Sequence, residues 1–295
     1  MNTPRREERR QPSWEMVALL GRVSVVPGAT RGLGLATATA LAEMGANVVL
    51  LGRDGERGEA AAQRTRAAAA PGADASFVSL DLASFASVCA AAAEIASMHD
   101  AVHLLVNNAG VHLRSRAVSR DGFEMTWAVN HLGPFLFTNQ LLPQLRAAAD
   151  ARIVTVTSRF AQFGRVAHGT IGTARASSGL RAYCDTKLAN MLFTIELARR
   201  LERTSVVANC VHPGVVATDL MREWPRWIRR TWEWSLRTPE SGASPIVRLG
   251  VSPSVAGVTG RYFVRERRAS FPKRARDPRV AQELWEESER LVGLR

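Results

Sequence analysis

Tyr183 and Lys187 are the two residues of this sequence whose types and spacing best suit proton transfer. They lie four positions apart in a helix-like segment, and positions i and i+4 share one face of a helix. A phenol has an ordinary pKa of about 10, but a neighbouring ammonium favours the phenolate and lowers that pKa. The pair therefore predicts a tyrosine that donates and accepts a proton, with an ordinary half-buried helix tyrosine as the alternative.

A glycine-rich segment, 28–34, has the spacing G-x-x-x-G-x-G and precedes an Ala- and Leu-rich run. Glycine allows the backbone to approach a phosphate closely, and a helix N-terminus offers free N–H groups and a partial positive charge. The spacing differs from the G-x-G-x-x-G of the usual dinucleotide fingerprint. The segment predicts a pyrophosphate site, and a tight strand–helix turn without a ligand is the alternative.

Two arginines flank the same predicted site. Arg31 lies in the glycine-rich segment, and Arg53 follows the next strand-like run, where an acidic residue would bind the ribose 2′-hydroxyl of NAD. Guanidinium groups bind phosphate well. We therefore expect NADP(H) as cofactor, unless the two are ordinary surface arginines of an arginine-rich chain.

Short apolar runs alternate with longer helix-like runs along most of the chain. This alternation predicts βαβ units, a parallel sheet and helices on both faces, which together make an α/β fold with a doubly wound, Rossmann-type sheet in one domain. We expect strands at 23–26, 47–51, 76–80, 103–106, 153–157 and 206–211, and helices at 33–44, 56–70, 85–97, about 123–148, 182–201 and 278–292. In such sheets ligands bind beyond the carboxyl ends of the strands.

Composition bounds the remaining possibilities. The 295 residues carry a net charge of +12, and arginines crowd the ends and the later segments. Three cysteines argue against a disulfide framework, and we see no secretory signal or membrane-spanning run. We expect a cytoplasmic protein with a disordered basic arm at 1–12, a catalytic domain at 13–295 and a helical lid at about 219–240. A nucleic-acid partner would rest on charge alone and is not expected.

The residues after the predicted strands resemble the short-chain dehydrogenase/reductase family. The glycine segment, Asn107-Asn108-Ala109-Gly110, the Tyr183/Lys187 pair and Pro213-Gly214 occur in that family's order. The stretches 127–135, 183–190 and 211–216 resemble its retinol dehydrogenase-like branch. The resemblance covers about residues 17–295.

The resemblance implies hydride transfer between NADP(H) and a carbonyl or alcohol. Tyr183 would exchange the proton, Lys187 would also hold the nicotinamide ribose, Ser158 would bind the substrate oxygen, and Asn130 would keep a relay water in place. No metal is expected. The residues predicted to hold the cofactor are Gly28, Thr30, Arg31, Gly32, Leu33, Gly34, Arg53, Asp81, Leu82, Asn108, Ala109, Gly110, Tyr183, Lys187, Pro213, Gly214, Val216 and Thr218.

Two departures bear on this assignment. Pro27 stands where the family has a threonine whose hydroxyl ties the glycine turn to a neighbouring strand, so weaker cofactor binding is expected. Asp185 adds a negative charge near Tyr183, although at i+2 it should point elsewhere on the helix. We expect His212 to be structural and Cys184 to be buried rather than reactive.

Four tryptophans in the predicted lid, Trp224, Trp227, Trp232 and Trp234, favour a bulky lipophilic substrate such as a retinoid, steroid, terpenoid or long-chain aldehyde. Packing of the lid on the body is the alternative. The Trp and Arg mixture is also compatible with weak peripheral membrane contact, and the resemblance leaves a homo-oligomer open. Outside enzymes, the alternative function is a non-catalytic NADP(H)-binding sensor or scaffold of the same fold.

Overall fold

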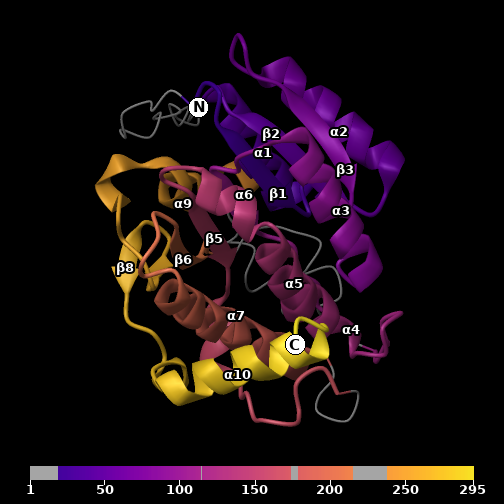
Figure 1. Ribbon diagram of the computed structural model, residues 1–295, viewed down its shortest axis with the longest axis vertical. Coiled ribbons are helices and arrows are strands. Elements are labelled where there is room, and N and C mark those ends of the chain that lie inside the picture. Colours follow the sequence, from indigo (N-terminus) through magenta and orange to yellow (C-terminus); the bar gives the residue numbers. More distant parts are fainter. Residues whose placement is uncertain (1–18, 114, 174–178, 215–237) are drawn as a thin grey trace, which may run out of the picture.

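The computed structural model describes residues 19–113, 115–173, 179–214 and 238–295. In these residues eight strands form one sheet in the order β3-β2-β1-β4-β5-β6-β7-β8, with β8 antiparallel to β7 and all other pairs parallel (Figure 1). The strands are β1 Val23–Pro27, β2 Asn47–Gly52, β3 Ala75–Ser79, β4 Leu104–Asn107, β5 Arg152–Val156, β6 Val207–His212, β7 Arg261–Val264 and β8 Arg267–Ala269. The predicted doubly wound sheet is confirmed.

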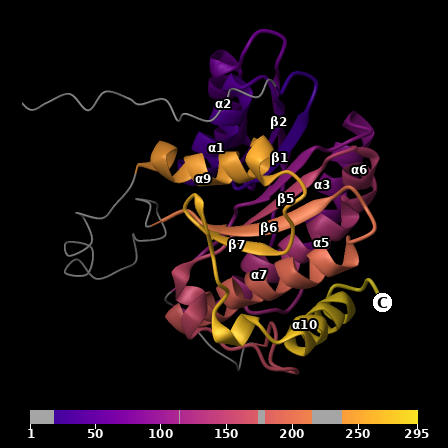
Figure 2. The same ribbon diagram turned by 90° about the vertical axis from the view of Figure 1, so that its left-hand side faces the viewer.

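Helices cover both faces of the sheet (Figure 2). On one face lie α1 Gly32–Glu43, α2 Gly55–Ala68 and α9 Pro239–Val251, and on the other lie α3 Phe85–Met98, α5 Gly133–Gln140, α6 Leu142–Ala147 and α7 Leu180–Arg200. Helices bury both faces of the inner strands. These strands are therefore continuous runs rich in valine and leucine. The result is two cores, one around Leu41 and Ile246 and the other around Ile95 and Leu188.

The predicted helical stretch at about 123–148 is present, but it is not one regular α-helix. The chain forms α4 (Met125–Trp127), a π-helical turn η1 (Ala128–Leu132), then α5 and α6. Pro134 has no N–H to donate to the carbonyl of Asn130, four residues earlier, so regular helix bonding cannot pass this point. Asn130 lies in the π-helical turn, directly before α5, and its side chain is fully buried.

The strand pair β7–β8 and helix α9 were not predicted. Helix α9 has Pro245 in its interior, and an internal proline argues against a helix when it is read from sequence, although Pro239 in the first turn suits a helix start. The Thr238 side chain nonetheless caps α9 by accepting a hydrogen bond from the Ser241 N–H. These elements extend the sheet beyond the six strands that the sequence indicated.

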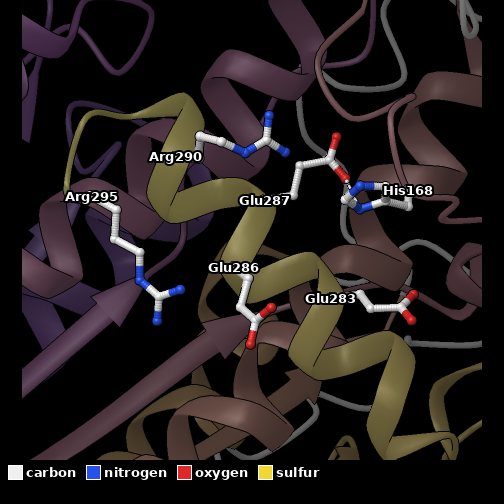
Figure 3. Close-up of a pocket in the computed structure, with 6 residues that line it drawn as sticks. All are labelled: His168, Glu283, Glu286, Glu287, Arg290 and Arg295. Carbon is white, nitrogen blue, oxygen red and sulfur yellow. Dashed lines mark ion pairs between the residues drawn. The ribbon is translucent and has the colours of Figure 1, made fainter.

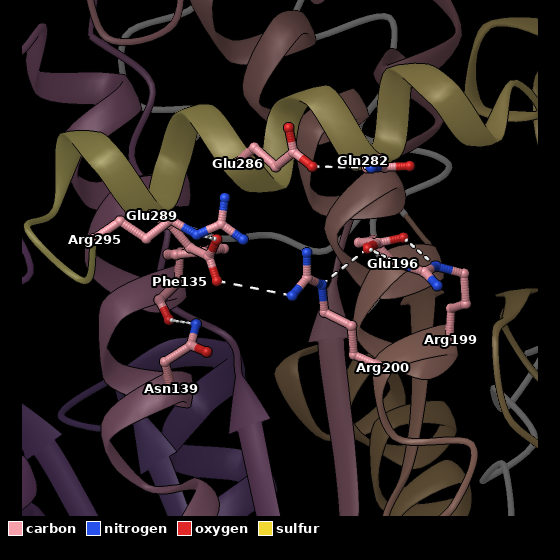
Figure 4. A network of polar contacts seen from close by, with 9 residues as sticks. All are labelled: Phe135, Asn139, Glu196, Arg199, Arg200, Gln282, Glu286, Glu289 and Arg295. Atoms are coloured by element: carbon pink, nitrogen blue, oxygen red, sulfur yellow. Dashed lines mark hydrogen bonds and ion pairs between the residues drawn. The ribbon is translucent and has the colours of Figure 1, made fainter.

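The C-terminal helix α10 (Pro278–Leu291) confirms the predicted terminal helix and lies along α7 (Figure 1). Trp285 is buried, stacks on Phe193 of α7 with centroids 5.7 Å apart, and meets Phe135 of α5 edge-on at 4.8 Å. The Arg200 guanidinium lies 4.5 Å from the centre of the Trp285 ring. It also pairs with Glu289 at 3.8 Å (Figure 4). The helix is therefore part of the core.

The ranges that the structure describes contain no helix long and apolar enough to cross a membrane. The predicted arm at 1–12 and nearly all of the predicted lid, with its four tryptophans, lie outside the described residues. The last lid positions, 239 and 240, begin α9.

Candidate active site

Tyr183 and Lys187 lie one turn apart on α7, and both are buried. The Lys187 Nζ is 5.7 Å from the centre of the Tyr183 ring. It donates to the Val156 carbonyl at 3.1 Å, and the Lys187 carbonyl accepts from Thr157 Oγ1 at 2.8 Å. The end of β5 thus holds the lysine at both its side chain and its backbone.

Burial dominates the electrostatics of this pair. It raises the pKa of Tyr183 to about 12, and a hydrogen bond with Ser158 opposes that rise in pKa only in part. Burial also lowers the pKa of Lys187 to about 8. The prediction that Lys187 brings the tyrosine pKa below its ordinary value is therefore wrong for the protein by itself. At neutral pH Tyr183 carries its proton, which suits a proton donor.

Ser158 begins the short 3₁₀ helix η2 (Arg159–Phe163), directly after β5. Its hydroxyl accepts a 3.3 Å hydrogen bond from the Phe160 N–H and also bonds with Tyr183. The Phe160 ring meets the Tyr183 ring at 6.2 Å between centroids. Ser158 and Tyr183 are brought together, as predicted, beside an aromatic surface.

The Asn130 side chain ties the loop after β4 to α7. Its Oδ1 accepts from the Val111 N–H at 2.7 Å, and its Nδ2 donates to the Val111 carbonyl at 3.0 Å and to Thr186 Oγ1 at 3.1 Å. Both amide hydrogens are therefore in use. The expected role of Asn130 in holding a relay water stays a prediction.

The glycine-rich turn is a close-packed cradle. A Cβ on Gly34 would lie 2.2 Å from the Gly28 carbonyl oxygen and 2.6 Å from Asn108 Nδ2, so only glycine fits there. Gly28 has a φ of +72°, which also favours glycine. The N-terminus of α1 has no side-chain cap, so its first N–H groups remain available to a phosphate. These residues fit a dinucleotide.

The glycine-rich turn is held by hydrogen bonds despite Pro27. The β1–β4 ladder ends at Val25↔Leu105, before the proline. The N–H groups of Gly28 and Ala29 donate to the Leu51 carbonyl at 2.8 and 3.1 Å, and Asn108 Nδ2 donates to the Pro27 carbonyl at 3.1 Å. Backbone and amide bonds hold the turn without a threonine hydroxyl. The expectation of weaker cofactor binding is untested.

The other predicted cofactor residues lie at the carboxyl edge of the sheet. A Cβ on Gly110 would come within 3.2 Å of the Lys187 Nζ, so the loop after β4 reaches Lys187. Asp81 and Leu82 follow β3, Ala109 lies beside Gly28, Pro213 and Gly214 follow β6, and Thr30, Arg31, Gly32 and Leu33 belong to the turn into α1. Arg53 is exposed directly after β2. Val216 and Thr218 lie outside the described residues.

Three further predictions concern neighbours of the pair. Asp185 faces away from Tyr183: its carboxylate accepts from the Arg165 N–H at 2.7 Å and pairs with Arg181 at 3.1 Å. Cys184 is buried, and burial raises the pKa of its thiol to about 11. His212 is buried, and burial lowers its pKa to about 4. The orientation of Asp185 and the burial of Cys184 agree with the predictions, and the structural role of His212 stays a prediction.

Sequence reasoning missed several supports of the site. Thr157 holds the Lys187 backbone, and Thr186 accepts a hydrogen bond from the Asn130 amide. Asn108 was predicted as a cofactor residue, but its hydrogen bond to the glycine turn was not. Thr157 and Thr186 each stand next to a predicted catalytic residue in the sequence, which is the signal that could have found them. The Phe160 contact had a similar signal, two positions after Ser158.

A cavity of about 490 Å³ lies elsewhere, along α10 (Figure 3). Glu287 points from α10 toward His168, 3.1 Å away, and accepts from the Gly169 N–H at 3.0 and 3.1 Å. The cavity is lined by His168, Glu283, Glu286, Glu287, Arg290 and Arg295. None of these is a predicted site residue, so the cavity is separate from the site around Tyr183.

Comparisons with known proteins decide the family. The family model described as short chain dehydrogenase matches residues 22–229. The chain belongs to the short-chain dehydrogenase/reductase family. Retinol dehydrogenase 14 of Mus musculus is 38% identical, over 98% of this chain and 91% of its own. Polyprenol dehydrogenase of Mus musculus is 41% identical, over 92% of this chain and 84% of its own.

A solved structure, the Pseudomonas aeruginosa RhlG/NADP active-site complex, is 25% identical with a TM-score of 0.70, over 84% of this chain and 95% of its own. The retinol dehydrogenase-like resemblance is confirmed by the relatives. This short-chain dehydrogenase/reductase is therefore an oxidoreductase of a family that uses nicotinamide cofactors.

Proposed function

We propose that the protein transfers hydride between NADP(H) and the carbonyl or alcohol group of a bulky lipophilic substrate. The observation that carries the proposal is the placement of Ser158, Tyr183 and Lys187 together at the carboxyl edge of the sheet. The glycine-rich turn lies at the same edge, so a cofactor bound there and a substrate bound at Tyr183 would be neighbours.

Arg53 supports the choice of NADP(H) over NAD. It is exposed after β2 and forms no hydrogen bond or ion pair with any residue in the described ranges. Its position is the one where an acidic side chain would select the ribose 2′-hydroxyl, and a guanidinium there suits a 2′-phosphate instead. The turn residues 28–34 would hold the pyrophosphate and Lys187 the nicotinamide ribose.

Each catalytic side chain has a defined task in carbonyl reduction. Bound nicotinamide supplies the hydride. Ser158 donates a hydrogen bond to the carbonyl oxygen and orients it. Tyr183, protonated at neutral pH, gives its proton to that oxygen as charge develops there. The Lys187 ammonium, fixed by Val156 and within reach of the Tyr183 ring, stabilises the phenolate that remains.

Apolar side chains around Tyr183 support a lipophilic substrate. Phe160 contacts the Tyr183 ring, Phe163 is 57% exposed, and Leu180 at the start of α7 is 45% exposed. Exposed apolar side chains beside a catalytic group suit an apolar ligand. The names of the retinol and polyprenol relatives point to lipophilic alcohols. Membrane contact, oligomerisation and cytoplasmic location stay predictions.

Fluorescence titration with NADPH and NADH, followed by turnover of all-trans-retinal, tests the proposal. We expect tighter binding of NADPH that is lost in Arg53→Ala, and turnover that is lost in Tyr183→Phe. Arg57→Ala, an exposed arginine already paired with Asp54, is the matched control. Binding without turnover of retinal or of a panel of other carbonyls would instead indicate the non-catalytic sensor, and equal affinity for both nucleotides would refute the cofactor assignment.

A further inference from the structure

Two arginines stand on either side of His212 at the carboxyl edge of the sheet. Arg159 directly follows Ser158 at the end of β5, and Arg265 directly follows β7. Strand β6 lies between β5 and β7 (Figure 2), with His212 opposite Val264 in the β7 register. The Arg265 N–H donates to the His212 carbonyl at 2.8 Å. Adjacent strands are about 4.8 Å apart, so two arginine side chains can reach the same group from the flanking strands.

Neither guanidinium has a partner among the residues that the structure describes. Arg159 and Arg265 are both exposed, and neither forms a hydrogen bond or ion pair through its side chain there. The nearest acid in sequence, Glu266, accepts from Ser244 at 3.2 Å and lies 3.9 Å from Arg248. Within the described ranges, no acidic side chain neutralises the positive charge of the pair.

Both charges act on the space around His212. Burial lowers the pKa of His212 first, and the positive charges of Arg159 and Arg265 lower that pKa further. The imidazole is consequently neutral at physiological pH and adds no charge of its own. Both arginines are therefore near enough to His212, at the end of β6, to act on its charge.

The backbone at Arg265 is unusual. It occupies the first position of a two-residue hairpin turn between Val264 and Arg267, with a φ of +56°. It is the one non-glycine residue of the described ranges with a positive φ. Glycine is favoured at such turn positions. A long charged side chain here is conformationally costly, and such residues cluster at ligand-binding positions.

We propose that Arg159 and Arg265 form a subsite for an anionic group, a carboxylate or phosphate, carried by the substrate. Guanidinium groups bind both anions through paired N–H donors. The subsite lies one residue from Ser158, which holds the reacting oxygen, so both ends of one molecule would be bound at the same edge. This inference rests on the proposed function and refines it: the substrate is amphiphilic, with an apolar body beside Phe160 and Phe163.

A series of matched probes tests the subsite. Three medium-chain aldehydes share one alkyl chain that ends in a carboxylate, a phosphate or a methyl ester. We expect kcat/KM of the wild type to be about tenfold higher for an anionic probe than for the ester, the range of a partly exposed charged contact. The anion with the larger ratio identifies the group.

Two variants remove the charges. Arg265→Gly suits the positive φ, so it is expected to fold, and Arg159→Gln keeps a polar side chain. Each should lower the anion-to-ester ratio of kcat/KM at least threefold, on the order of half of the charged contact. Arg267→Gln, on the same hairpin, is the control and should leave the ratio unchanged. An unchanged ratio in both variants, an equal loss in the control, or an effect on the KM for NADPH alone would overturn the proposal.

A binding measurement separates this inference from the proposed function. If the wild type reduces none of the aldehydes, the proposed function fails, and calorimetry with the saturated fatty acid of the same chain length decides the subsite. Binding that is lost in Arg265→Gly and kept in Arg267→Gln supports the subsite. Binding equal in all three proteins, or in none, refutes it.

Discussion

Replacing Lys187 with methionine should abolish activity and stabilise the protein at neutral pH. Lys187 is 4% exposed, and burial lowers its pKa from the ordinary 10.5 to about 8. A pKa fall of this size corresponds to about 3 kcal/mol of stability lost by keeping the ammonium charged inside the fold. Methionine is unbranched and of similar length, so it fills the same space. It forfeits the hydrogen bond to the Val156 carbonyl, about 1 kcal/mol.

The expected net gain is therefore about 2 kcal/mol at pH 7. Because the pKa of Lys187 is lower in the folded protein, the unfolded chain binds more protons between pH 8 and 10.5, and wild-type stability rises with pH over that window. The stability lost by burying the Lys187 ammonium falls to about 1 kcal/mol at pH 9.5. The advantage of Lys187→Met should accordingly shrink to near zero at that pH.

Urea unfolding followed by tryptophan fluorescence at the two pH values measures this difference. Other titrating groups are common to both proteins and cancel. The chain offers a matched control in Lys273→Met, since Lys273 is exposed, and we expect its effect to stay within about 0.5 kcal/mol at both pH values. A Lys187→Met protein less stable than the wild type at pH 7, or an advantage that does not change with pH, would refute the reasoning.

Three further predictions follow from packing and hydrogen bonding. Gly34→Ala forces a Cβ to within 2.2 Å of the Gly28 oxygen, so NADPH binding by fluorescence should weaken at least about tenfold; unchanged affinity would refute the cradle. Trp285→Ala should cost about 3–5 kcal/mol in urea unfolding, and a loss below about 1 kcal/mol would mean that α10 is not part of the core. Glu287→Ala leaves the Gly169 N–H without its carboxylate and should cost about 2 kcal/mol, whereas exposed Glu283→Ala should cost little.

The core of the fold and the placement of Ser158 beside Tyr183 were within reach of sequence reasoning. Valine-rich strands such as 47–52 and the Ala-rich helices have strong periodic patterns, and the parallel order follows from their alternation. The residues after the strands follow from the rule that ligands bind at carboxyl ends. Ser158 and Tyr183 meet across 25 residues because β5 ends beside α7.

Effects that depend on burial in the folded protein, such as pKa shifts, could not be predicted from the sequence. The pKa of Tyr183 rises because the residue is only 6% exposed. Helix spacing in the sequence shows that Lys187 is near Tyr183, but it does not show that burial removes water from the phenol. The break at Pro134 and the prolines of α9 are local signals whose outcome depends on tertiary packing. The arginine pair around His212 needs the register of β6 with β7, which the sequence did not indicate.

The C-terminal region is bonded to the long segment between Ser158 and Tyr183. The segment after η2 is fastened at several points: Arg274 donates to the Gly164 carbonyl at 2.7 Å, Asp185 accepts from the Arg165 N–H, and Glu287 binds the Gly169 N–H. Two of these three contacts come from the last 22 residues, 274–295. Ser158 begins the segment and Tyr183 lies just beyond its end, so the C-terminal region restrains the chain that connects these two predicted catalytic residues.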